Sequence, residues 1–309
     1  MSARPRPGRI VWAVDPFPED RTLQLRTLKA VGVFRGRSDI SIEPVAVVSP
    51  DGLRIAPGVF LAPGMRYQQQ ARDTVSKWVA ASRIANVSAP TVLVQDTRSL
   101  RQTVGTLLRY ARKTRAALVA VSTHARTRLD RFVMGSFAET LLLHADIPLL
   151  IVNPSVGDLR DVRRLLFPTD FSAGSRSAFQ AILPVAKRHR TTVTLFSQCE
   201  YLVPETAAQV RSVPAYQQFF ERDVAAKRAK GRAWAAVAGK RGVTAKVAIG
   251  QHPGFVPESI LAAAKASKAS LIAMASQSGT VAATVLGSVT RQVVRQARCP
   301  VWVIHTWQH

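Results

Sequence analysis

Acidic residues and cysteines are scarce in this chain, and long apolar runs are missing. The 309 residues include 19 Asp and Glu against 43 Lys and Arg, and two cysteines, Cys199 and Cys299. The two cysteines lie 100 positions apart (199 to 299) and lack the spacing of metal ligands. This usage suits a reducing cytoplasm better than a disulfide framework. No apolar stretch approaches the roughly 20 residues of a membrane-spanning helix, and the N-terminus lacks the apolar segment of a signal peptide. We therefore expect a cytoplasmic protein with no membrane partner and no bound metal.

The shortage of acid leaves a formal net charge of +24. A charge of this size attracts polyanions such as nucleic acid. The excess is shared by both halves of the chain, however, and no nucleic-acid-reading motif accompanies it. A solvated cationic surface is the favoured interpretation. Association with nucleic acid remains an alternative, and its affinity would fall steeply with salt.

What the sequence does contain is one pattern stated twice. In each half an apolar run ends in Asp, a Gly-Ser pair follows much later, and an apolar run that begins with Pro closes the half. From Asp to Gly there are 120 positions in the first copy (15 to 135) and 117 in the second (170 to 287). This repeat predicts two similar domains, residues 1–156 and 157–309. The markers are Asp15, Gly135, Ser136 and Pro148, then Asp170, Gly287, Ser288 and Pro300.

Each half alternates five strand-length apolar runs with four helical patterns. The runs are apolar nearly throughout, as in a parallel sheet covered on both faces. We therefore predict an α/β fold with two tandem doubly wound, five-stranded parallel sheets. Pro184 falls inside a predicted helix, which it should kink or split. The predicted strands are 9–14, 42–48, 91–95, 117–121, 148–152, 163–168, 192–197, 244–249, 270–274 and 300–305; the predicted helices are 22–35, 70–85, 99–115, 136–145, 173–190, 216–240, 255–267 and 288–297.

Two ordered sets of residues resemble the universal stress protein family in its tandem-domain form, over nearly the whole chain. The second half opens with Leu166-Phe167-Pro168-Thr169-Asp170-Phe171-Ser172, and the first half closes with Met134-Gly135-Ser136 through Ile147-Pro148-Leu149-Leu150-Ile151-Val152. The resemblance implies the adenine nucleotide alpha-hydrolase-like fold with strand order 3-2-1-4-5, and a role in stress response. It also implies protein partners or self-association, with segments 148–152 and 300–305 side by side as an internal pseudo-dimer.

In members of that family that bind ATP, the motif is G-x-x-G, nine residues, then G-S or G-T. Glycines let backbone amides approach phosphate, and the Gly-Ser pair opens a helix whose N-terminus faces the anion. The first half keeps this spacing from Ser122 to Gly135, with altered residue types, and Arg128 and Arg131 add positive charge near the loop. We therefore expect a weak ATP or other adenine-nucleotide site in this half. Its residues are Val14, Asp15, Ser122, Thr123, Ala125, Arg126, Gly135, Ser136 and Phe137, with His124 beside them.

The second half departs further from the motif. Its corresponding segment, Ala275-Ser276-Gln277-Ser278, has no glycine and stands one residue too close to Gly287-Ser288. A one-residue deletion moves backbone amides by up to about 3.5 Å, more than a hydrogen bond tolerates. We expect a degenerate site there, formed by Asp170, Gly287 and Ser288. For Ser136 and Ser288 the alternative role is a helix cap, and for the two Asp residues it is a local turn.

No catalytic motif for hydrolysis, redox chemistry or metal-assisted reaction is present. The sequence therefore predicts a stress-response protein that is not an enzyme, with weak ATP hydrolysis left open. Two alternatives to nucleotide binding stay open: a scaffold that acts through protein contacts, and a basic surface that associates with nucleic acid.

Overall fold

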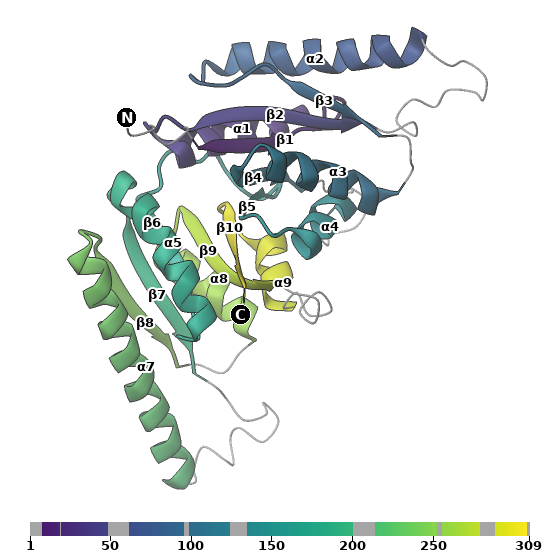
Figure 1. Ribbon diagram of the computed structural model, residues 1–309. Helices are drawn as coiled ribbons and strands as arrows, with labels where there is room; N and C mark the ends of the chain where they lie inside the picture. The colour runs from purple at the N-terminus through teal and green to yellow at the C-terminus, as the bar shows by residue number, and fades with distance from the viewer. Residues whose placement is uncertain are drawn as a thin grey trace. The chain divides into compact units, whose positions relative to one another are not determined.

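The computed structural model describes residues 8–18, 20–48, 62–95, 99–123, 135–199, 214–251, 255–278 and 288–307 (Figure 1). The chain separates into two compact units, Met1–Arg160 and Asp161–His309. The sequence placed the division slightly earlier, between residues 156 and 157. The predicted pairing of 148–152 with 300–305 concerns the placement of the two units, and it stays a prediction.

Unit 1 is a parallel sheet with helices on both faces (Figure 1). Strand β1 pairs with β2 and β4, β2 with β3, and β4 with β5, all in parallel. The order β3-β2-β1-β4-β5 confirms the predicted 3-2-1-4-5. In chain order the elements are β1 (Arg9–Ala13), α1 (Arg21–Arg35), β2 (Ser41–Val48), α2 (Ala62–Ser82), β3 (Thr91–Val94), α3 (Leu100–Lys113), β4 (Ala116–Ser122), α4 (Ser136–His144) and β5 (Leu149–Val152).

The strands of unit 1 are apolar because both faces are covered. Trp12 of β1, at the centre of the sheet, is fully buried, as is Leu107 of α3. Right-handed crossovers place α1 and α2 on one face and α3 and α4 on the other, and the members of each pair contact one another. Helix α1 begins where the carboxylate of Asp20 accepts hydrogen bonds from the amides of Thr22 and Leu23, at 2.8 and 3.3 Å.

Unit 2 repeats the same arrangement. Strand β6 pairs in parallel with β7 and β9, β7 with β8, and β9 with β10. The order β8-β7-β6-β9-β10 is again 3-2-1-4-5 in terms of position along the half. The elements are β6 (Arg164–Pro168), α5 (Ala173–His189), β7 (Thr192–Gln198), α7 (Pro214–Lys240), β8 (Ala245–Gly250), α8 (Val256–Ala266), β9 (Leu271–Ser278), α9 (Ser288–Gln296) and β10 (Val301–Trp307).

An aromatic cluster packs the long helix α7 against α5 and the segment that follows β6. Trp234 stacks on Phe179 with ring centroids 4.8 Å apart and meets Phe171 edge-on at 5.3 Å. Gly231 allows the closest approach, since a Cβ atom there would lie 2.6 Å from a methyl carbon of Val247 on β8. Figure 1 shows α7 running along β8. These contacts position one face of α7 beside the carboxyl ends of the strands.

At two helices the structure excludes one of the outcomes that the sequence offered. Helix α5 runs unbroken through Pro184, where a split was one of the predicted outcomes. Pro184 lies on the exposed face, where water can satisfy the carbonyl of Gln180 that the proline cannot. Ser136 is the first helical residue of α4 and not its cap. Gly135 takes the cap position with extended backbone, and its carbonyl accepts the first helical bond from Glu139 at 3.1 Å.

Strand β9 is longer than predicted. The sequence placed its end at 274, but it continues to Ser278 and pairs with β10 as far as Trp307. Without glycines, residues 275–278 have no reason to leave the extended conformation, and β10 supplies hydrogen bonds along their length. Within the part of the chain that the structure describes, no helix is long and apolar enough to cross a membrane.

Candidate functional site

Each unit carries a cavity at the point where the order of its strands reverses. In a doubly wound sheet the helices after neighbouring central strands lie on opposite faces, which leaves a crevice at the carboxyl ends of those strands. The reversal falls between β1 and β4 in unit 1 and between β6 and β9 in unit 2. The residues at the ends of these strands line the two cavities.

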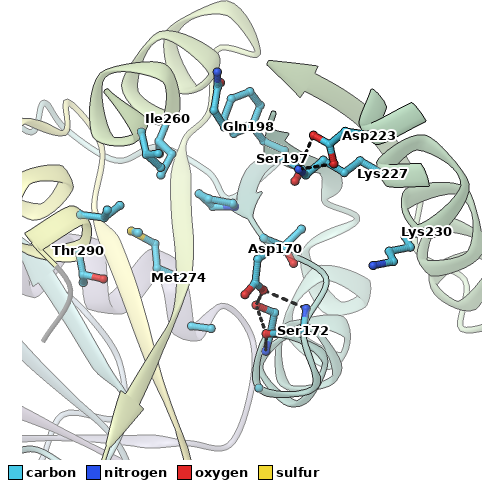
Figure 2. Close-up of a pocket in the computed structure, with 18 of the residues that line it drawn as sticks. Asp170, Ser172, Ser197, Gln198, Asp223, Lys227, Lys230, Ile260, Met274 and Thr290 are labelled. Atoms are coloured by element: carbon cyan, nitrogen blue, oxygen red, sulfur yellow. Dashed lines mark hydrogen bonds and ion pairs between the residues drawn. The ribbon is translucent and has the colours of Figure 1, made fainter. Parts of the chain in front are cut away.

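The cavity of unit 2 has a volume of about 590 Å³ (Figure 2). Polar side chains from β6, β7 and α7 form one wall, and apolar side chains from α8, β9 and α9 form the other. The described lining is Pro168, Thr169, Asp170, Ser172, Gly174, Ser175, Phe196, Ser197, Gln198, Asp223, Ala226, Lys227, Lys230, Val256, Ile260, Met274, Ala275, Val289 and Thr290.

Asp170 is held in place at the end of β6. One oxygen of its carboxylate accepts hydrogen bonds from the backbone amide of Ser172 at 2.9 Å and from the hydroxyl of Ser175 at 2.5 Å. Desolvation works to raise the pKa of Asp170, but the hydrogen bonds from Ser175 and Ser172 outweigh it and lower the pKa below its ordinary value. Ser172 also caps α5, accepting from the amide of Ser175 at 3.2 Å. The carboxylate is therefore ionised and fixed in direction.

Helix α7 brings two ammonium groups to the same cavity. Lys227 donates to both carboxylate oxygens of Asp223, at 2.8 and 2.7 Å. Lys230 lies one turn further along, and Figure 2 shows its nitrogen on the side of the helix that faces Asp170. Within the described residues Lys230 makes no ion pair. The lining thus holds two carboxylates and two lysines.

The apolar wall and the start of α9 complete this cavity. Ile260 and Met274 are nearly fully buried, with 3% and 5% of their surface exposed. Residues 275–278, which align with the family's phosphate loop, belong to strand β9 and pair with β10. Ser288 is the exposed first residue of α9, and the next two residues, Val289 and Thr290, line the cavity. Gly287 lies outside the described residues.

The cavity of unit 1 is smaller, at about 290 Å³, and mostly apolar. Val14, Asp15, Ser122 and Phe137, four of the predicted site residues, meet around it. The side-chain amide of Gln24 donates to the hydroxyl of Ser122 at 2.9 Å. Asp15 is the one charged residue in the described lining, which is Ala13, Val14, Asp15, Pro16, Gln24, Val45, Val47, Thr103, Leu107, Val121, Ser122 and Phe137.

The remaining predicted residues of unit 1 are not in that described lining. Thr123 is buried, and its amide donates to the carbonyl of Val152 at 2.9 Å. Gly135 caps α4 and Ser136 is exposed at its first position. Ala125 and Arg126 fall outside the described residues, together with His124, Arg128 and Arg131. Whether these residues form a nucleotide site remains a prediction.

Sequence reasoning missed Lys227 and Lys230 as site residues. The run of cations from 227 to 232 is part of the solvated cationic surface that the sequence favours, and the spacing within it was the available signal. Asp223, Lys227 and Lys230 stand at i, i+4 and i+7, which puts them on one face of a helix. Only the packing of α7 against β8 decides that this face lines a cavity. Among the described residues no group of acidic, histidine or cysteine side chains could hold a metal ion.

The chain is thus a tandem protein of two Rossmann-like α/β units. Each unit has a cavity where the order of its strands reverses. The universal stress protein family matches residues 8–153 and again 161–305, and the chain belongs to that family. No curated protein matches this chain.

Solved structures support the fold. The chain is similar to a universal stress protein from Archaeoglobus fulgidus DSM 4304, with 19% identity, a TM-score of 0.67 and 96% of each chain covered. It is also similar to a functionally unknown protein from Pseudomonas aeruginosa PAO1, with 13% identity and a TM-score of 0.60, covering 97% of this chain and 93% of that one. At these identities the likeness concerns the fold alone.

Proposed function

We propose that this member of the universal stress protein family acts in stress response by binding a small organic anion in the cavity of unit 2. An adenine nucleotide is the ligand class to test first. The proposed activity is binding and not catalysis: the hydroxyl of Ser175 donates to Asp170 in the lining, but the lowered pKa of that carboxylate makes it a weak general base.

The observation that carries this proposal is the joint presence of Asp170 and two lysines around a cavity of about 590 Å³. Ligand cavities usually measure roughly 300 to 1,000 Å³, so this volume is ample and that of unit 1 is marginal. A carboxylate at the end of a central strand suits a ribose hydroxyl, the ammonium groups suit phosphate, and the apolar wall suits a base. The three features match the three parts of a nucleotide.

We expect phosphate binding by lysines to be weaker than binding by the backbone amides of a glycine-rich loop. Residues 275–278 of β9 are committed to the sheet, so the lysines would replace the amides that the family's motif supplies. An ammonium group on a flexible stem orders itself at an entropic cost, while loop amides are already fixed. We therefore expect weaker binding than at a glycine loop, and a ligand that exchanges readily.

The test is calorimetric titration of the full-length chain with AMP, ADP and ATP. We expect binding that falls by roughly tenfold to a hundredfold in Asp170→Asn, because the variant loses a charged hydrogen-bond acceptor. Asp15→Asn is the matched control in unit 1 and should leave the affinity unchanged. If Asp15→Asn abolishes binding and Asp170→Asn does not, the nucleotide belongs in unit 1. If neither protein nor variant binds any of the three, the scaffold alternative takes precedence.

A further inference from the structure

One face of α7 presents its charges to the cavity of unit 2 as an internal ion pair followed by a second lysine. The Lys227 ammonium lies 2.7 Å from the Asp223 carboxylate, with 14% and 22% of the two side chains exposed. Lys230 follows on the same face. Figure 2 shows the ion pair on the α7 side of the cavity, with Asp170 at the end of β6.

We propose that Asp223 is a built-in competitor for the ligand's anionic group, which holds Lys227 while the cavity is empty and yields it to the ligand. This inference rests on the proposed function of the unit 2 cavity. It assigns Lys227 and Lys230 as the anion-binding residues and Asp223 as the residue that limits affinity. The ligand's phosphate takes the place of the Asp223 carboxylate as the partner of Lys227.

The exchange is energetically modest. A single helical ion pair at i and i+4 contributes little to stability, because each long side chain loses freedom when it is held in one geometry. This pair is mostly buried but lines the cavity, so an incoming phosphate can reach the ammonium group without unfolding any element. The cost of parting Asp223 from Lys227 is then small compared with the gain from a dianionic phosphate, which also meets Lys230.

A second group lies near Asp223 besides Lys227. The thiol of Cys199, which follows β7, is 2% exposed and neighbours the Asp223 carboxylate. Burial, together with the neighbouring Asp223, raises the pKa of Cys199 to about 11, so the thiol keeps its proton and can donate it to the carboxylate. A protonated thiol is therefore close to the Asp223 carboxylate when Lys227 turns to the ligand.

The charges that face the anion are Asp170, Asp223, Lys227 and Lys230, two of each sign in the described lining. Replacing Asp223 by Asn removes one negative charge and releases Lys227. Both changes favour an anion, so Asp223→Asn should bind AMP roughly two- to fivefold more tightly than the unmodified protein. Lys227→Gln and Lys230→Gln should each weaken binding by a similar factor.

The experiment is calorimetric titration of AMP and, separately, of inorganic pyrophosphate into the full-length chain and its variants. Glu221→Gln is the matched control, since it removes the same charge from the exposed side of α7, away from the cavity lining. We expect tighter binding for Asp223→Asn and less than roughly half that gain for Glu221→Gln. The gain should shrink when Lys227→Gln is also present, because no lysine is then released.

Equal effects of Asp223→Asn and Glu221→Gln would overturn the inference, since only net charge would then matter. An undiminished gain in the double variant would overturn it as well. If AMP binds and Asp170→Asn abolishes that binding while Asp223→Asn changes nothing, the inference fails and the proposed function stands. If pyrophosphate binds with the expected pattern and AMP does not bind, the inference stands and the nucleotide proposal fails. Absence of binding for both probes contradicts both.

Discussion

The cavity of unit 2 encloses about 590 Å³ and that of unit 1 about 290 Å³, although both lie at the same position of the same fold. Lysines from α7 line the larger cavity, whereas the described lining of the smaller one has a single charge, that of Asp15. The two units therefore share the position of the cavity and differ in the side chains that line it. On this difference the proposed function favours unit 2, whereas the loop motif alone favoured the N-terminal half, and which half binds a nucleotide stays a prediction.

The largest expected effect is a loss of stability in unit 2 that leaves unit 1 unchanged. Phe179 of α5 is 1% exposed and stacks on Trp234, so Phe179→Ala should lower the free energy of unfolding of unit 2 by about 3 to 5 kcal/mol. Unit 1 should keep its stability. Chemical denaturation followed by fluorescence and circular dichroism would show this as a separate, earlier transition. A single transition shifted as a whole would mean that the units unfold together.

A smaller effect concerns the packing of α7 against β8 at Gly231. Gly231→Ala would place a Cβ atom 2.6 Å from Val247, which forces α7 away from β8, whereas Gly239→Ala on the same helix meets nothing within 4 Å. Gly239→Ala should stabilise the helix by up to about 1 kcal/mol. Gly231→Ala should lie about 1 to 3 kcal/mol below that control in denaturant unfolding, and it should weaken AMP binding because the lysines move with α7. Two variants of equal stability would show that α7 is free to shift.

The smallest effect is a pH dependence specific to unit 2. The folded state lowers the pKa of Asp170, so its ionised form contributes stability above its ordinary pKa, and this contribution is lost as the pH falls through the lowered value. Asp170 is largely exposed, which screens the effect. Ser175→Ala removes a hydrogen bond to the carboxylate and should move the acid unfolding midpoint of unit 2 slightly upward. No change in the midpoint would mean that this hydrogen bond contributes nothing to the pH dependence.

The fold could be predicted from the sequence because its signals are repeated and local. Buried strands such as Leu149–Val152 are uniformly apolar, and Asp15 and Asp170 recur with their Gly-Ser partners at matching spacing. The 3-2-1-4-5 order came from the family resemblance and is confirmed in both units. Four of the predicted site residues of unit 1 do surround one cavity, since they follow neighbouring parallel strands.

What the sequence could not supply depends on contacts between distant elements. The capping of α4 by Gly135 and not Ser136 depends on a shift of one residue, which no helical pattern determines. The extension of β9 to Ser278 depends on β10 being long enough to pair with it. Lys227 and Lys230 line the cavity because α7 packs closely against β8 at Gly231.

A crystal structure of the full-length chain with AMP tests the central claim most directly. The account predicts the nucleotide in the cavity of unit 2, with its phosphate beside Lys227 and Lys230, its ribose beside Asp170, and the ion pair between Lys227 and Asp223 opened. A nucleotide seated beside Asp15 and Phe137, with the cavity of unit 2 empty and its ion pair intact, would contradict it.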